Sequence, residues 1–282
     1  MFGKMRRVYG GFFRAGAQGA MAYQLNFMGF FIGESLYCFV MYFIWKAVFM
    51  ASGESTFMGF TLVDMTMYVF LSNIVGFFTG TDSTRALAEE IRDGNIIMRM
   101  IKPVNVDLSL LATEVGNNVV YFAFIFAPVM LGVEIYRYFA LGYVAFDIVL
   151  FLTFVLSMIL SYILSFYLNL IFGYLAFWLM NIWGFDILKG SIIKFFSGAM
   201  IPLAFFPGIV RDIFELLPFA SMVYTPTMIY MGKITGVNIA LALGGQIIWI
   251  LVFYALAKLM WHFAQKRLAV QGGSAYEIFK TL

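Results

Sequence analysis

The stretch that decides the fold is TDSTRALAEEIRDGNIIMRMIKPVNVD, residues 81–107. It gathers many charges in one run, whereas the sequence on either side of it is almost wholly apolar. Its charged residues are Asp82, Arg85, Glu89, Glu90, Arg92, Asp93, Arg99, Lys102 and Asp107. Such a run must mostly meet water or another protein, because charged groups are costly inside a bilayer. We therefore interpret residues 81–107 as the cytoplasmic face of a membrane protein, and as the place where a partner drives that protein.

The composition excludes a soluble globular class. Of the 282 residues, 63% are hydrophobic, 20% are aromatic and only 12% are charged, and the mean hydropathy is +0.91. Soluble domains carry about 25% charged residues. The apolar runs are continuous and do not alternate with period two, which favours a helical bundle over a β-barrel. The predicted fold class is an all-α integral membrane protein, with one transmembrane domain over residues 1–272 and a flexible tail at 273–282.

Six apolar segments predict six transmembrane helices, since a span needs about 20 apolar residues. The predicted spans cover about 23–49, 61–80, 108–135, 143–180, 187–205 and 238–261. The fourth segment is longer than one span requires, but only Asn169 and Gly173 interrupt it. We therefore predict one long helix there, tilted or kinked near those two residues.

The basic residues indicate the orientation. Residues 1–20 mix Lys and Arg with aromatic residues, which predicts an interfacial helix on the anionic inner leaflet; the alternative is a frayed basic flank. The two ends of the chain and the segments 81–107 and 181–189 hold most of the Lys and Arg, so this side is predicted to be cytoplasmic. With six spans, both termini lie on it. We expect no cleaved signal peptide, and the single cysteine, Cys38, excludes a disulfide within the chain.

A short helix is predicted inside the charged stretch. Asp82 or Ser83 can cap its start and Gly94 can end it. Leu87 and Ile91 share one face of this helix at i and i+4, while most of the charges lie elsewhere. The helix is therefore predicted to be amphipathic.

Glycine and proline mark two places where the chain turns. Gly94 and Pro103 bracket an apolar stripe, after which the chain is predicted to re-enter the membrane. Residues 206–237 stay apolar but are broken by prolines and glycines, which predicts short helices dipping into the outer leaflet. The residues singled out for this outer region are Gly198, Pro202, Pro207 and Pro218.

The residue inventory argues against catalysis by this chain. It has one histidine, His262, and neither an H-E-x-x-H nor a G-x-S-x-G motif. It also lacks G-x-x-x-x-G-K-[ST], so we expect no nucleotide hydrolysis, no cofactor and no metal in this chain. Nucleic-acid-binding motifs are absent, and we predict no nucleic-acid partner.

Polar residues within the predicted spans are candidates for a translocation path. An ionisable group at membrane depth faces the bundle interior, a cavity or a partner, because lipid cannot solvate it. The alternative is that these residues join helices through hydrogen bonds and salt bridges. The candidates are Glu34, Glu114, Asn117, Asn118 and Lys194.

The order of these features resembles the permease subunit of ABC transporters of the ABC-2 class, in the bacterial efflux-related branch. Two sets of motifs carry the resemblance. They are GNII (94–97) with IKPV (101–104), and SGAMIPL (197–203) with FP (206–207), LPF (217–219) and TP (225–226).

The resemblance implies an exporter in the bacterial cytoplasmic membrane. It would contain two permeases, either two copies of this chain or this chain with a related one, and two separate ATPase subunits that bind ATP and Mg²⁺. The family's coupling helix falls by position on 83–93, and its re-entrant outer helices fall on about 206–224. Leu87 and Ile91 would enter the ATPase as apolar knobs, with charges setting the register. The coupling residues so implied are Arg85, Leu87, Glu89, Glu90, Ile91 and Arg92.

Two other function classes remain open at this point. An ion-coupled secondary transporter would work without an ATPase, and would show matched broken helices in two halves. The helix-breaking residues gather only at 198–236, which disfavours it. The second class is a non-transporting membrane scaffold, which would give no functional reason for the proline- and glycine-rich segment 198–236.

Overall fold

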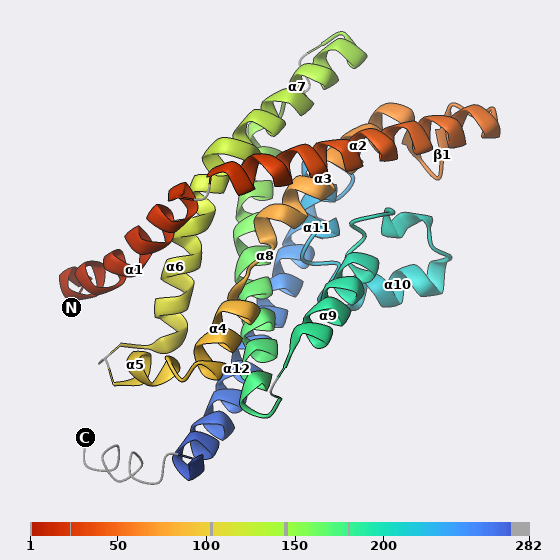
Figure 1. The fold of residues 1–282 in the computed structure, drawn as a ribbon. Helices are drawn as coiled ribbons and strands as arrows, with labels where there is room; N and C mark the ends of the chain where they lie inside the picture. Colours follow the sequence, from red (N-terminus) through yellow and green to blue (C-terminus); the bar gives the residue numbers. More distant parts are fainter. Residues whose placement is uncertain (1, 23, 102–103, 144–145, 180, 272–282) are drawn as a thin grey trace.

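The computed structural model describes residues 2–22, 24–101, 104–143, 146–179 and 181–271, and these are mostly helical (Figure 1). A two-stranded antiparallel hairpin, β1 (Thr56–Phe57) and β2 (Phe60–Thr61), joins the second and third helices. The helices are α1 (Phe2–Ala22), α2 (Gln24–Ser52), α3 (Leu62–Thr79), α4 (Ser83–Arg92), α5 (Ile96–Met100), α6 (Val106–Tyr121), α7 (Ala127–Leu141), α8 (Ile148–Tyr174), α9 (Trp183–Phe196), α10 (Gly208–Leu216), α11 (Tyr224–Tyr230) and α12 (Val237–Gln271).

Among the described residues, five helical segments are long and apolar enough to cross a membrane. They are Phe31–Ser52, Leu62–Arg92, Val106–Leu141, Ile148–Phe177 and Val237–Arg267. The third combines α6 and α7 through a π-helical turn, Phe122–Phe126. Pro128 follows this turn and has no N–H for a normal helical bond, so a wider turn fits there. The fourth is one helix, as predicted, and ends in a 3₁₀ turn at Leu175–Phe177.

The predicted fifth span, about 187–205, is not confirmed as a membrane-length helix. α9 has 14 residues and is therefore about 21 Å long, whereas the apolar core of a bilayer is about 30 Å thick. Gly198 ends the helix, because its φ of +75° belongs to the left-handed region that glycine tolerates best. A 3₁₀ turn at Leu203–Phe205 follows Pro202.

The chain nevertheless has to return between α8 and α12, because these two helices run parallel. Gln246 of α12 bonds Ser157 of α8, and further along both helices Trp261 stacks near Tyr174. Both helices therefore begin at one end of the bundle and finish at the other. The return is made by α9 together with the irregular segment and short helices α10 and α11, as Figure 1 shows.

The end of the bundle that carries α4 also holds the start of α1 and the end of α12. The Tyr9 hydroxyl accepts a bond from the Asn105 backbone N–H at 3.2 Å. Lys258 of α12 reaches Asp107 of α6 at 2.7 Å. The basic flanks and the charged stretch thus share one end, which is what the charge pattern predicted.

α1 packs against α6 through glycine. A Cβ on Gly16 would lie 2.0 Å from the Thr113 carbonyl oxygen, and a Cβ on Gly116 would lie 2.0 Å from the Phe13 carbonyl oxygen. Only glycine allows two backbones to approach so closely. The predicted N-terminal helix is confirmed as a helix, while its interfacial position stays a prediction.

Candidate functional site

α4 is set into the ends of its neighbours and does not stand free. Leu87 is fully buried and sits on Gly173 of α8, where an added Cβ would lie 2.9 Å from Leu87 Cδ2. Ser83 Oγ donates to Glu114 Oε1 of α6 at 3.0 Å. The Ser83 hydroxyl is therefore engaged by α6, and neither it nor Asp82 makes the predicted side-chain cap.

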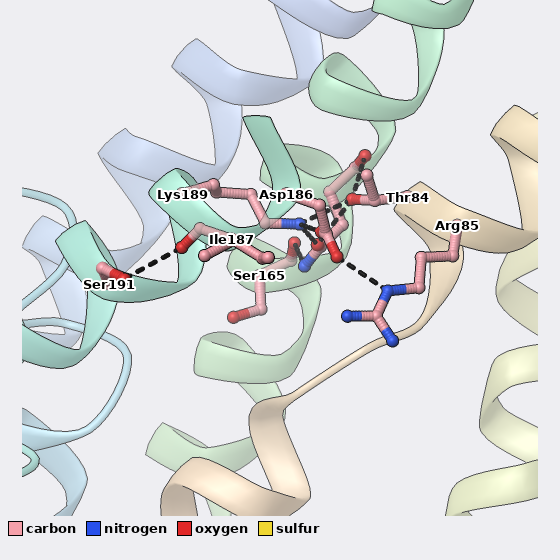
Figure 2. A network of polar contacts seen from close by, with 8 residues as sticks. Thr84, Arg85, Ser165, Asp186, Ile187, Lys189 and Ser191 are labelled. Atoms are coloured by element: carbon pink, nitrogen blue, oxygen red, sulfur yellow. Dashed lines mark hydrogen bonds and ion pairs between the residues drawn. The ribbon is translucent and has the colours of Figure 1, made fainter. Parts of the chain in front are cut away.

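A polar cluster, buried except for Arg85, joins α4 to α8 and α9. We call it the α4–α9 cluster; it consists of Thr84, Arg85, Asn169, Asp186 and Lys189. Lys189 Nζ donates to Thr84 Oγ1 at 2.7 Å, to Asn169 Oδ1 at 2.5 Å and to Asp186 Oδ1 at 2.7 Å. Arg85 Nε donates to Asp186 Oδ2 at 2.7 Å. Figure 2 shows Arg85 reaching from α4 to the same carboxylate that Lys189 contacts.

The electrostatics of the cluster depend on Asp186. Its carboxylate lies between two cations, and the Lys189 side chain is only 8% exposed. Burial by itself would raise the pKa of the Asp186 carboxyl, but hydrogen bonds from Lys189 and Arg85 outweigh it and hold that pKa below its usual value. Asp186 therefore stays ionised at neutral pH. A buried cation without such a partner would be strongly destabilising.

A groove runs from this cluster into the bundle. Its volume is about 650 Å³, and α2, α3, α8, α9 and the start of α4 line it. Arg85 and Asp186 belong to its lining near α4. Farther along, α2 contributes Glu34, whose Oε2 accepts a bond from Asn73 Nδ2 of α3 at 2.8 Å. The groove thus carries polar and charged side chains from several helices, set among a mainly apolar lining.

The groove contains two of the five polar candidates for a path. Glu34 and Lys194 line it, and Lys194 is an exposed side chain of α9. The other three do not line it. Glu114 is buried against Ser83, Asn118 is buried within the bundle, and Asn117 lies beside α1, with its Oδ1 3.9 Å from where a Gly19 Cβ would be. Of these three, Glu114 joins α6 to α4 through its bond with Ser83, and the roles of Asn117 and Asn118 stay predictions.

Comparison with protein families shows what this bundle is. The family model described as ABC-2 family transporter protein matches residues 36–272. The chain belongs to the ABC-2 transporter family. It is a multi-pass membrane protein, and family members are typically non-catalytic membrane subunits that associate with ABC ATPases. Comparison with curated proteins gives no match.

The six coupling residues predicted for this ABC-2 protein divide between the inside and the surface. Leu87 is buried on Gly173, and Ile91 packs half-buried in the same apolar cluster. The structure therefore places neither as a projecting knob. Glu90 is paired with Arg99 of α5 at 2.5 Å, and Arg85 with Asp186. Glu89 and Arg92 are exposed, and their role in coupling stays a prediction.

The turn and outer residues lie as follows. Gly94 has a φ of +74° and ends α4 as predicted, because the left-handed region is open to it. Pro103 lies outside the described residues. Gly198 accepts a bond from the Tyr68 hydroxyl at 2.6 Å. Pro202 precedes a 3₁₀ turn, Pro207 precedes α10, and Pro218 follows α10. Short helices occur in the outer region as predicted, and their depth in a membrane stays a prediction.

Sequence reasoning missed four polar residues that the tertiary structure makes important. Asp186 and Lys189 lie in the segment 181–189, which was used only to orient the chain, although their i, i+3 spacing on a helix is a salt-bridge signal. Asn73 stands inside the apolar run of α3, and a polar side chain in such a run is a signal that could have identified it. Gln246 is fully buried in α12, and its amide donates to Ser157, Ser161 and the Ser221 carbonyl. A lone Gln in a long apolar run is the signal that could have identified it.

Proposed function

We propose that this chain is the membrane-spanning subunit of an ATP-driven exporter that works with separate ATPase subunits. The groove lined by α2, α3, α8 and α9 carries the proposal. It is a groove of about 650 Å³ that begins at α4 and continues into the bundle, with charged and polar side chains set among a mainly apolar lining. A chain of this family with such a route needs an energy source from a partner, because its sequence holds no phosphate-binding motif.

In this proposal two permeases, two copies or this chain with a related one, enclose the path, and the ATPases supply ATP and Mg²⁺. The end of the bundle that carries α4 faces the cytoplasm, with both termini, because the basic residues gather there. Residues 206–224 form the outer helices. The cytoplasmic membrane of a bacterium is the expected location.

The surface that would meet the ATPase is the exposed side of α4 and α5. Leu87 is not available for this role, because it is buried on Gly173. The large apolar side chains exposed here are instead Ile97, Met98 and Ile101, at 49%, 58% and 59%. Glu89 and Arg92 of α4, a few residues earlier in the chain, are exposed charges. An apolar centre with charges around it is the usual anatomy of a protein interface.

Co-purification with a candidate ABC ATPase, expressed together with this chain, tests the proposal. We expect Ile97→Ser combined with Met98→Ser to reduce recovery of the ATPase by about tenfold or more, since exposed apolar anchors dominate such interfaces. Met50→Ser is the matched control, because Met50 is 75% exposed on α2, near the hairpin. Solute movement in liposomes without any ATPase would support an ion-coupled carrier and overturn the proposal.

A further inference from the structure

The α4–α9 cluster links α4, which is part of the surface proposed to meet the ATPase, to the α9 wall of the groove. α4 touches α9 through the ion pair from Arg85 to Asp186. Asp186 lies one helical turn from Lys189, and both line the groove on α9 together with Lys194. This ion pair therefore connects α4 to the α9 wall of the groove.

The rest of α4 is fixed in a different way. Leu87 packs on Gly173, and the Thr84 hydroxyl donates to the Asn169 carbonyl and side-chain oxygens, so α8 holds α4 by close packing and neutral hydrogen bonds. Lys189 bridges the two arrangements, because it donates to Thr84 of α4, Asn169 of α8 and Asp186 of α9. One buried ammonium group thus holds three helices at a single point.

We propose that the α4–α9 cluster is a joint that makes α9 follow α4, so that nucleotide binding at the ATPase moves the α9 wall of the groove. Arg85, Asp186 and Lys189 are positioning residues in this proposal. The inference rests on the proposed function, since it assumes that an ATPase acts on α4.

The geometry favours a joint that stays closed. Lys189 and Asp186 are nearly excluded from water, with side chains 8% and 11% exposed, and their polar contacts are all made inside the cluster. Pulling α9 away from α4 would leave a buried charge without its partner, which is unfavourable. Moving α4 and α9 together keeps the contacts from Arg85 to Asp186 and from Lys189 to Thr84, whereas the bonds to Asn169 are kept only if this part of α8 moves with them.

A fluorescence reporter on α9 tests the joint in the complete complex of permease and ATPase in nanodiscs. The only cysteine of this chain is removed by Cys38→Ala, and the label is placed at Leu188→Cys, because Leu188 is 57% exposed on α9. The permease is labelled before the ATPase is added, so that any cysteine of the ATPase stays unlabelled. A non-hydrolysable ATP analogue is the ligand added. We expect it to change the emission of the label, and Arg85→Gln to reduce that change by about fivefold or more while the ATPase still co-purifies. Arg85→Lys should keep most of the response, because it retains a cation for Asp186.

The controls separate this inference from the proposed function. Lys46→Gln removes an exposed cation of α2 that has no ion pair among the described residues, and should leave the response unchanged. Asp186→Asn is a second test of the ion pair, although it also leaves Lys189 without its carboxylate. Arg85→Gln disturbs the fold less, because the Arg85 side chain is 62% exposed. A full response in both variants overturns the joint. Loss of ATPase binding in Arg85→Gln also overturns it, because Arg85 would then belong to the docking surface. If the wild-type permease fails to bind the ATPase, the proposed function itself fails.

Discussion

Truncating Leu87 distinguishes a core residue from a partner-facing one. Its side chain is fully buried, and Gly173 of α8 leaves the space that it fills. Replacing a buried leucine with alanine costs about 2–5 kcal/mol, from lost contacts and from the cavity that remains. We expect Leu87→Ala to lower the free energy of unfolding of the isolated permease by that amount, with no ATPase present. Unfolding in mixed micelles, followed by circular dichroism, measures this.

The neighbouring glycine gives an internal check on the same contact. Gly173→Ala alone should destabilise by about 1–3 kcal/mol, because the new methyl would lie 2.9 Å from Leu87 Cδ2. In the Leu87→Ala background the terminal methyl groups are gone and the clash is relieved. The destabilisation of the double variant should therefore be smaller than the sum of the two single variants by about 1 kcal/mol or more. Ile97→Ala, at a residue 49% exposed, should stay within about 0.5 kcal/mol.

The opposite result would refute this reasoning. If Leu87→Ala leaves the unfolding of the lone permease unchanged and removes only the recovery of the ATPase, Leu87 is a projecting knob. The buried contact with Gly173 would then not exist in the membrane.

Three further predictions concern other helix contacts. Gly116→Ala should lower the free energy of unfolding by more than about 2 kcal/mol, since its Cβ would lie 2.0 Å from a carbonyl oxygen of α1. Gly132→Ala is the control and should be neutral or stabilising, because an added Cβ would have no neighbour within 4 Å. Equal effects of the two substitutions would contradict the close packing of α1 on α6. Lys258→Met should cost about 3 kcal/mol in the same assay, because it leaves the buried Asp107 carboxylate without its cation; adding Asp107→Asn should recover part of the loss, and no recovery would contradict the pairing. Thr61→Ala removes the capping box of α3 and should cost about 1 kcal/mol, seen as faster hydrogen exchange in the first turn of α3; unchanged exchange would contradict it.

The helices themselves were largely predictable from the sequence, because local patterns determine them. Long apolar runs predicted α2, α3 and α12 to within a few residues at most ends, although α12 continues beyond its predicted end. Gly94 correctly predicted where α4 ends. The family too could be named from the sequence, since its motifs are contiguous, and the family model confirms it over residues 36–272.

The fifth span shows where local reasoning fails. Hydropathy alone treats 187–205 as one apolar segment, but Gly198 and Pro202 end the helix at Phe196. A count of apolar residues does not register a backbone reversal. The parallel arrangement of α8 and α12 shows that the chain does return there, as six spans would require, but no membrane-length helix among the described residues makes the return.

For residues 81–107, some properties follow from the local sequence and others depend on how the helices pack. The sequence by itself determined that residues 81–107 are polar, that they contain an amphipathic helix, and that Leu87 and Ile91 share its apolar face. Periodicity defines a face, but it does not say what the face meets. The tertiary structure decided that Leu87 turns inward, because Gly173, 86 positions along the chain, leaves room for it. It also brought Lys189 to Thr84 across a separation of 105 residues, a contact that depends on how α4, α8 and α9 pack together.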